Sequence, residues 1–461
     1  MGRVSASPDA AAIADAVRDL DAGHDRALSA SYVLQAGGEQ AALKIRDNWQ
    51  YLSLLGQRRA LSPLSRLASD YDAAIEALVV AARSDDEEIR AAAFAALERS
   101  APRGRDGLVV LVFDPVVGDR AAASLARTDP TFALEPLLSA MQGAAGADRP
   151  GLRYALAAAV RRSEDDPERR VRNWLAGGPD PAAVGSAAAG LASIEDHREL
   201  IAALIEYAAP KSNDFPTAWR LLQSAKAAGP SEQVDRWVRS QLDGPEQWML
   251  REAAVDAITA RGHRQDARAS LGDPYPRVRA RAAMALSGDS ASLVGRATLA
   301  RRDIWPMVRA DAVRSLRTEG EAIPVIVAAV DDSMSMVRVA AIEVLTASSH
   351  EEGWARIHRR LRASNEWPQV TVAAIDYVVA HCRTDAVQAL LRLVLRASPS
   401  DAGTDDLNNA ARAIVALRIL GTPEAEAAVE QLRLRQGVPP TLKMALEQPL
   451  AEDSRCPRTG R

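Results

Sequence analysis

The stretch from residue 273 to residue 345 carries the same pattern three times. Each copy reads Asp-x4-Val-Arg-x2-Ala, followed three and four residues later by a small or β-branched residue and a Leu. The copies begin at Asp273, Asp303 and Asp332. They start about 30 residues apart, a period typical of chains that stack one structural unit many times. This feature predicts a row of similar units and argues against a single closed core.

The spacing of apolar residues within each copy predicts a helix with one buried stripe. In the first copy the stripe consists of Val278, Ala282, Ala285 and Leu286, which fall on one face of a helix with 3.6 residues per turn. Because the two alanines are small, a neighbouring helix can pack closely against them. Asp273 precedes a Pro, and this pair is a helix-start signal, since Asp caps backbone N–H groups and Pro tolerates the first turn.

The Arg that follows each buried Val requires a partner, because an unpaired buried guanidinium is unfavourable. Since Arg and Asp recur in the same phase, we expect each Arg to bond the Asp of an adjacent repeat through charge-assisted hydrogen bonds. The alternative is that these arginines are merely solvated. The predicted Asp/Arg ladder consists of Asp273, Arg279, Asp303, Arg309, Asp332 and Arg338.

The recurring motif resembles the second helix of HEAT-like repeats, especially the short repeats of phycobilisome-lyase-type proteins. The resemblance implies an α-solenoid of antiparallel helix pairs; members of this group bind proteins or nucleic acid, and a few are enzymes. Related stripes start roughly 28 to 37 residues apart through most of the chain, below the usual HEAT period. We therefore expect short helices of about 10 to 14 residues.

The chain length fits a solenoid better than a compact domain. With 461 residues the chain is too long for one core, whereas each solenoid repeat contacts only its neighbours. Strand-type alternation is nearly absent. We predict an all-α fold, an α-solenoid (superhelix) of about twelve antiparallel helix pairs with an N-terminal helical cap. The expected divisions are residues 1–70 for the cap, 71–448 for the HEAT-like repeats and 449–461 for a disordered polar tail.

Several segments depart from the regular pattern. Residues 39–59 read as one long helix inside the predicted cap. Gly118 and Gly185 stand where the repeat has Arg, and the sequence leaves open whether these two degenerate repeats form a binding site. Residues 398–406 form a polar Ser/Asp/Gly stretch, which we interpret as a mobile insert.

Charge, cysteine content and the distribution of apolar residues limit the class of binding partner and the cellular compartment that we expect. The net charge of −4 argues against nucleic acid, which favours a clearly basic face. Cys382 and Cys456 are too few for a disulfide framework, so we expect a reducing, cytoplasmic compartment. The N-terminus lacks an apolar signal-peptide run, and no stretch of about 18 apolar residues predicts a membrane span.

No motif predicts a catalytic or metal site. His350 and His358 are eight residues apart, but a zinc site needs three or four converging ligands, and solvated histidines are the simpler interpretation. His381 and Cys382 are adjacent without a third partner, and we expect Cys382 to pack as a small apolar residue. Phosphate-binding, dinucleotide and nucleophile-elbow motifs are absent. We predict no cofactor, no metal and no catalytic residue, although an activity without a known motif stays open.

A binding surface is expected on the second helices, which usually line the concave side of a solenoid. Their outward positions carry charges of both signs and an exposed Met, which suits a protein or peptide. Trp354 is a candidate aromatic anchor; Trp305 and Trp367 are others, or hold helix starts in the core. The predicted partner-binding residues are Arg281, Met284, Asp311, Arg314, Glu343 and Trp354.

Three functions remain open. The favoured one is a non-catalytic scaffold or adaptor that binds a protein or peptide along the concave face. The second is a lyase or enzyme-accessory protein of the phycobilisome-lyase type. The third is nucleic-acid binding, which would require Arg281, Arg301, Arg302 and Arg314 to converge on one groove.

Overall fold

The computed structural model describes residues 7–212, 214–244, 247–316, 320–348, 351–397, 402–450 and 455–456. Across these ranges the chain forms 29 α-helices and no strand, which confirms the predicted all-α fold. The chain separates into two compact units, unit 1 (Met1–Val238) and unit 2 (Arg239–Arg461).

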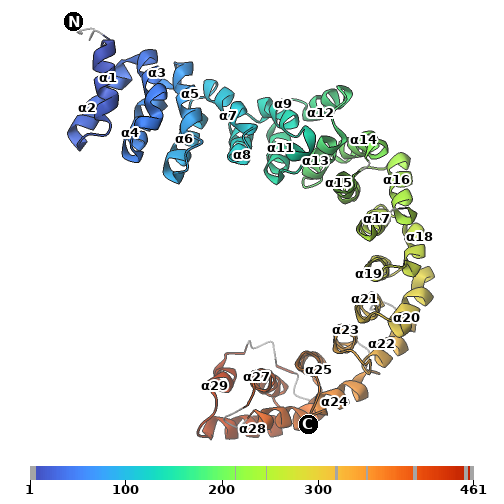
Figure 1. The fold of residues 1–461 in the computed structure, drawn as a ribbon. Coiled ribbons are helices and arrows are strands. Elements are labelled where there is room, and N and C mark those ends of the chain that lie inside the picture. Colours follow the sequence, from blue (N-terminus) through green and yellow to red (C-terminus); the bar gives the residue numbers. More distant parts are fainter. Residues whose placement is uncertain are drawn as a thin grey trace. The chain divides into compact units, whose positions relative to one another are not determined.

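Unit 1 is a stack of short antiparallel helices (Figure 1). Most helices from α1 to α8 pack against their neighbour in sequence and also against the next helix but one, for example α3 against α5 and α4 against α6. In order, its helices are α1 (Ala10–Asp19), α2 (His24–Ala36), α3 (Gly38–Asn48), α4 (Leu54–Leu67), α5 (Asp72–Ala81), α6 (Glu87–Arg99), α7 (Arg103–Val112), α8 (Gly118–Thr128), α9 (Pro130–Ala140), α10 (Gly143–Ala147), α11 (Pro150–Arg162), α12 (Pro167–Ala176), α13 (Pro181–Leu191), α14 (Arg198–Ala208) and α15 (Phe215–Ala225). The unit boundary falls inside α16 (Glu232–Asp243).

The predicted helix over residues 39–59 is wrong, because the chain bends in the middle of this segment. α3 ends at Asn48, and a 3₁₀ turn over Trp49–Tyr51 follows it. Ser53 then caps a new helix, since its hydroxyl accepts the Gly56 N–H at 3.2 Å. The four helices in residues 7–70 thus form antiparallel pairs like those that follow, and their separate status as a cap stays a prediction.

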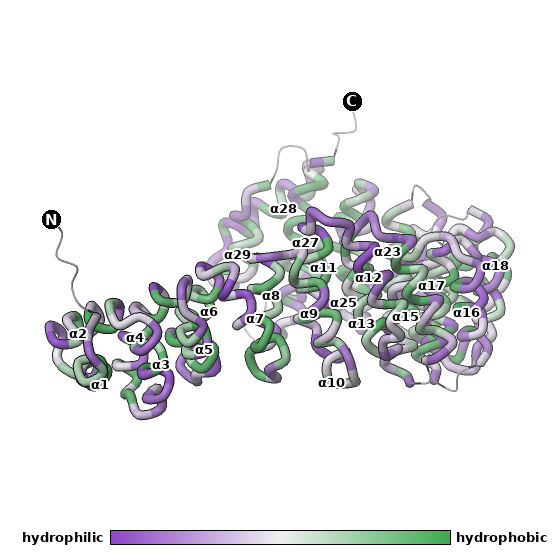
Figure 2. Tube along the Cα trace, turned by 90° about the horizontal axis from the view of Figure 1, so that it is seen from above, coloured by the Kyte–Doolittle hydropathy of each residue, from purple (hydrophilic) through white to green (hydrophobic). Residues whose placement is uncertain are grey.

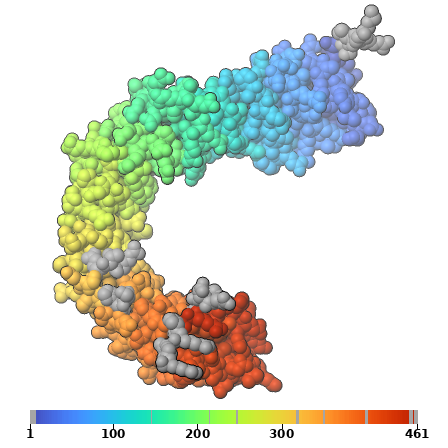
Figure 3. All heavy atoms as spheres, turned by 180° about the vertical axis from the view of Figure 1, so that it is seen from behind, coloured from blue at the N-terminus to red at the C-terminus, as the bar shows by residue number. Residues whose placement is uncertain are grey.

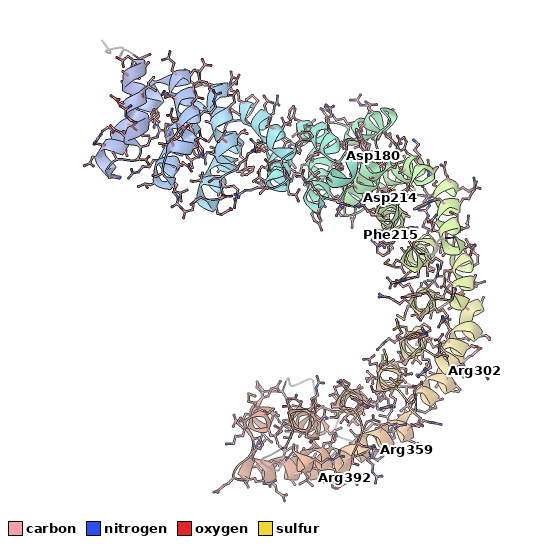
Figure 4. All side chains as sticks on the ribbon, in the orientation of Figure 1. Asp180, Asp214, Phe215, Arg302, Arg359 and Arg392 are labelled. Atoms are coloured by element: carbon pink, nitrogen blue, oxygen red, sulfur yellow. A yellow bond between two sulfur atoms is a disulfide. The ribbon has the colours of Figure 1, made fainter. Side chains whose placement is uncertain are left out.

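Carboxylate caps start many of these helices, as the Asp-Pro signals indicate. Asp180 accepts the Ala182 N–H at 2.9 Å at the start of α13, and Asp214 accepts the Thr217 N–H at 2.8 Å at the start of α15 (Figure 4). A Pro lies in the first turn of both helices. An N–H at this position has no partner within the helix, so the lack of one in Pro costs no hydrogen bond.

Unit 2 consists of two layers of helices (Figure 1). We call one the second-helix layer: α17 (Trp248–Ala260), α19 (Pro276–Ala285), α21 (Pro306–Ser315), α23 (Ser335–Thr346), α25 (Pro368–Ala380), α27 (Thr404–Leu420) and α29 (Pro440–Glu447). The other is the first-helix layer: α18 (Arg264–Ala267), α20 (Leu293–Arg302), α22 (Ile323–Ala329), α24 (Trp354–Arg362), α26 (Val387–Arg396) and α28 (Pro423–Leu434). Each second helix packs against the next one in its layer. Neighbouring colours along the chain also lie side by side within the unit (Figure 3), as expected when repeats contact only their neighbours.

The repeated stripe forms the core between the layers. Val278, Val308 and Val337 are completely buried, and so are the alanines four residues after each of them. In Figure 2 apolar and polar stretches are interspersed along the helices. This packing confirms a HEAT-like solenoid architecture, and the pairs from α5/α6 to α28/α29 number twelve when the short α10 is set aside.

The expectation that Cys382 packs simply as a small apolar residue is wrong. Cys382, two residues after the end of α25, forms a disulfide with Cys456, which lies 74 residues later in the sequence. The Cys456 N–H also donates to the Ile419 carbonyl at 3.0 Å, so the end of the chain is tied to two second helices. The cysteines therefore give no support to the expected reducing compartment. Residues 398–401, 451–454 and 457–461, which include parts of the predicted insert and tail, lie outside the described residues.

Candidate partner-binding surface

The Asp/Arg pattern of the sequence becomes a chain of ion pairs that links successive repeats of unit 2. Arg279 binds both carboxylate oxygens of Asp303, with Nε at 2.7 Å from Oδ2 and a terminal nitrogen at 3.0 Å from Oδ1. The same two-point contact joins Arg309 to Asp332, both at 2.8 Å. Each Arg also donates to the carbonyl of the Asp in its own repeat, at 2.8 Å in both cases. Every step thus fixes the spacing of two neighbouring second helices.

The ladder continues beyond the six predicted residues in both directions. At one end, Arg251 binds the carboxylate of Asp273 at 2.7 Å. At the other end, Arg338 pairs with Glu366, which takes the place of an Asp. The hydrogen bond with Asp303 raises the pKa of the Arg279 guanidinium and outweighs the opposing effect of burial, so the pair stays charged. The ladder is a rigid frame for the surface of the same helices.

Five of the predicted partner-binding residues lie on the exposed side of the second-helix layer. They are Arg281 and Met284 on α19, Asp311 and Arg314 on α21, and Glu343 on α23. Arg314 bridges Asp311 at 3.1 Å and Glu343 at 3.2 Å. Met284 is 39% exposed. The structure therefore brings these side chains onto one face, where cross-helix pairs hold the charged ones in place.

Trp354 does not lie on this face. It is 8% exposed, belongs to α24 of the first-helix layer, and its indole N–H donates to Asp385 at 2.7 Å. A partner cannot reach a side chain that is packed in the core, so the anchor role predicted for Trp354 is corrected. Trp305 and Trp367 are instead 48% and 59% exposed at the starts of α21 and α25.

A groove crosses the second-helix layer over α23, α25 and α27. It encloses about 940 Å³ and is lined by Val339, Glu343, Thr346, Ala347, Pro368, Gln369, Val372, Ala373, Asp376, Asp405, Asn408, Asn409, Ala411 and Arg412. A second depression of about 630 Å³ continues it across α25, α27 and α29 and shares Asp376, Ala411 and Arg412 with the first. We call the two together the second-helix groove. Small apolar side chains form its floor and polar side chains form its rim.

The rim of the groove is predominantly acidic. Glu343, Asp376 and Asp405 supply carboxylates, and Arg412 is the only cation among the lining residues of the larger depression. Asp376 pairs with Arg412 at 3.1 Å and its side chain is 54% exposed. Burial nevertheless raises the pKa of the Asp376 carboxyl, and Arg412 offsets this only in part. A further cation next to Asp376 would stabilise its charged form.

Sequence reasoning reached Glu343 but missed the rest of the groove. The pattern fades after residue 345, because Thr371 replaces the Arg of the ladder motif. One signal was present: Glu343 and Asp376 both lie six residues after the buried Val of their repeats, Val337 and Val370. Two carboxylates at one repeat position indicate a shared surface rather than two unrelated side chains.

The arginines required for a nucleic-acid groove do not converge. Arg281 and Arg314 lie on the second-helix layer. Arg281 is 2.7 Å from Asp256, and Arg314 forms ion pairs with Asp311 and Glu343. Arg301 and Arg302 lie on α20 in the first-helix layer. The four side chains therefore belong to two different surfaces of unit 2.

The described residues contain no cluster of three or more His, Cys, Asp or Glu arranged to hold a metal ion. His350 lies outside the described residues. His381 is 3.3 Å from the Leu345 carbonyl, and its ring lies against Tyr377. In the part of the chain that the structure covers, no helix combines the length and the apolar character needed to cross a bilayer.

No protein-family model and no curated protein matches this sequence. Among solved structures, importin beta in a polyethylene glycol condition aligns with a TM-score of 0.48 and 16% identity over 93% of this chain and 68% of its own. Kap121p bound to Pho4p aligns with a TM-score of 0.38 and 11% identity, covering 95% and 49% of the two chains. Kap121p bound to Nup53p gives 0.36 and 12%, with 95% and 48% covered. The chain spans about half the length of Kap121p, and similarity at this level supports no inference about what it binds.

Proposed function

We propose that this chain is a non-catalytic scaffold or adaptor that binds a protein or peptide partner along the second-helix layer of unit 2. The observation that carries the proposal is the second-helix groove, which combines an open apolar floor with an acidic rim. Apolar grooves with a polar rim are typical of sites that accept an amphipathic segment of another chain.

The floor of the groove favours a partner with apolar side chains. Val339 and Val372 are only partly buried, and Ala347 and Ala411 leave space beside them. Covering this surface removes apolar area from water, which contributes about 25 cal/mol for each Å². The last rung of the ladder, Arg338 with Glu366, holds α23 beside α25 at one end of the groove, so this end needs little ordering on binding.

The rim favours a partner that also carries basic residues. Asp405 has no cationic partner within ion-pair distance among the described residues, and the Asp376 carboxyl is held at a raised pKa by burial. Lys or Arg side chains of a bound segment would supply the missing charge and help to set its orientation. We infer an amphipathic basic segment as the chemical class of the partner.

Site-specific photo-crosslinking tests this function. A photoreactive amino acid at Val372 in the groove of the intact chain should crosslink a protein partner in an extract of the host cell. The matched control is the same amino acid at Leu395, an apolar side chain that is 63% exposed on α26 of the first-helix layer. We expect crosslinks from residue 372 that are absent from residue 395.

A charge-introducing variant provides the second test. Val372→Glu should abolish capture of the crosslinked partner, because a carboxylate buried against the apolar side of a ligand is strongly unfavourable. Leu395→Glu should leave capture unchanged. Failure to recover any protein with a folded bait, or equal capture by both variants, would contradict the proposal.

A further inference from the structure

A depression between α24 and α26 lies on the first-helix layer of unit 2. It encloses about 530 Å³ and is lined by Ala355, His358, Arg359, Arg362, Ala363 and Arg392. Arg359 and Arg392 extend from the side of these helices that faces away from the second-helix layer (Figure 4). No lining residue is a carboxylate. We call His358, Arg359, Arg362 and Arg392 the arginine pocket.

Two of the three arginines of this pocket have no acidic partner among the described residues. Arg360, which lies on α24 with Arg359 and Arg362, forms an ion pair with the Asp331 carboxylate at 2.7 Å. Arg359 is 3.6 Å from the same carboxylate, which it must share. Among the described residues, Arg362 and Arg392 have no carboxylate within ion-pair distance. The pocket therefore holds two guanidinium groups without a counter-ion and a third, Arg359, that shares one.

His358 is fixed at the wall of this pocket. Its ring stacks on the Trp354 ring with the centroids 4.9 Å apart, and Trp354 is itself held by its hydrogen bond to Asp385. Burial is the largest cause of the lowered pKa of His358; Asp385 opposes it, and the charges of Arg362 and Arg392 add to it. The stacking holds the imidazole in place, so that it offers a positioned nitrogen to an incoming anion.

The positive charge is confined to one place and does not form a track. The nearest pair of basic residues in an earlier repeat, Arg301 and Arg302, lies on α20. Between them and α24 comes α22 (Ile323–Ala329), which carries no charged residue. A nucleic-acid backbone needs phosphate contacts along an extended path, whereas one compact anion needs a single cluster. Guanidinium groups match the oxygens of a phosphoryl group with paired N–H donors.

We propose that the arginine pocket binds one phosphoryl group, carried either by a small molecule or by a phosphorylated side chain. The pocket lies on the opposite layer from the second-helix groove, so the proposal is independent of the function proposed for the groove. Its two arginines without partners supply charge-assisted hydrogen bonds, and His358 supplies a ring nitrogen at the wall. The chemistry is the same for both carriers, and the test separates them.

Isothermal titration calorimetry of the full chain tests this site with three probes: inorganic pyrophosphate, a phosphoserine peptide and the same peptide without phosphate. The binding variant is Arg362→Gln with Arg392→Gln. The matched control is Arg301→Gln with Arg302→Gln, two exposed arginines on α20 of the same layer. We expect the binding variant to weaken the association by about tenfold or more and the control to leave it unchanged. Circular dichroism spectra of both variants should match that of the parent, since all four side chains are exposed.

The outcomes divide clearly. Binding of pyrophosphate alone assigns a small phosphorylated molecule, and preferential binding of the phosphoserine peptide assigns a phosphorylated side chain; both support the site when the variant loses the signal. The proposal is overturned if no probe gives saturable heat, if both variants weaken binding equally, or if the unphosphorylated peptide binds as well as the phosphorylated one. A separate titration with duplex DNA also overturns the proposal if DNA binds through these arginines while pyrophosphate does not.

Discussion

Two sets of arginines in unit 2 show how one side chain serves two purposes. The ladder arginines Arg279 and Arg309 have side chains 13% and 11% exposed. Each donates hydrogen bonds from two nitrogens to an Asp of the next repeat. Arg359 in the arginine pocket is 66% exposed and has only a long contact to a shared carboxylate. An arginine stabilises the stack where the next repeat provides its carboxylate, and it remains available to a ligand where that carboxylate is missing.

Breaking one rung of the ladder should have the largest effect on stability. Asp303→Leu leaves the Arg279 guanidinium buried without its counter-ion, which should cost roughly 3–5 kcal/mol in the free energy of unfolding. Urea denaturation followed by circular dichroism measures this loss. The double variant Arg279→Leu with Asp303→Leu should recover much of it, because no unpaired charge then remains. A double variant as unstable as the single one would mean that the pair does not act through its charges.

Placing a large side chain in the buried apolar stripe of α19 should have the next largest effect on stability. Ala282 is completely buried between neighbouring second helices, so Ala282→Phe should destabilise the protein by about 1–3 kcal/mol. Met284→Phe on the exposed side of the same helix is the control and should change stability by no more than about 0.5 kcal/mol. Equal thermal midpoints for the two variants would show that the buried face of α19 is misassigned.

Acid should weaken the ladder by protonating its carboxylates. Burial opposes ionisation of Asp332, but hydrogen bonds from Arg309 and from the Met334 N–H outweigh it and lower the pKa of this carboxyl. A group with a lowered folded-state pKa contributes stability that is complete above its unfolded pKa of about 3.9 and is lost as pH falls through the folded value. Stability measured from pH 5 downward should therefore fall less steeply in Asp332→Asn than in the parent chain. Parallel curves would contradict this assignment.

Removing a pocket arginine should have the smallest effect on stability. Arg392 is exposed and makes no ion pair among the described residues, so Arg392→Ala should shift the unfolding free energy by less than about 0.5 kcal/mol. Thermal unfolding of this variant beside Arg309→Ala sharpens the contrast, because Arg309 is paired and largely buried. A loss of more than about 1 kcal/mol at Arg392 would place it among the structural arginines.

The sequence alone determined the parts of the fold that recur in phase. A repeated helical period sets which residues face the neighbouring helix, so it predicts that Val278, Val308 and Val337 are buried and that each ladder Arg bonds an Asp of an adjacent repeat. The structure shows that the following repeat supplies this Asp, as Asp303 does for Arg279. Prediction failed where the pattern is broken. Trp354 is buried at the start of α24 in the first-helix layer rather than exposed on the binding face, since a helical period does not say which of two layers an aromatic side chain will enter.

Only the tertiary structure decided the contacts made between segments that share no pattern. Gly118, which looked like a missing Arg, leaves the space that Arg149 fills as it bonds the Val112 carbonyl at 2.8 Å and Asp119 at 2.9 Å. The disulfide between Cys382 and Cys456 also joins segments that share no pattern. So does the depression that Arg362 and Arg392 line together. Local periodicity in the sequence encodes helices and the faces they bury, whereas the neighbours of an irregular residue depend on how the repeats stack in three dimensions.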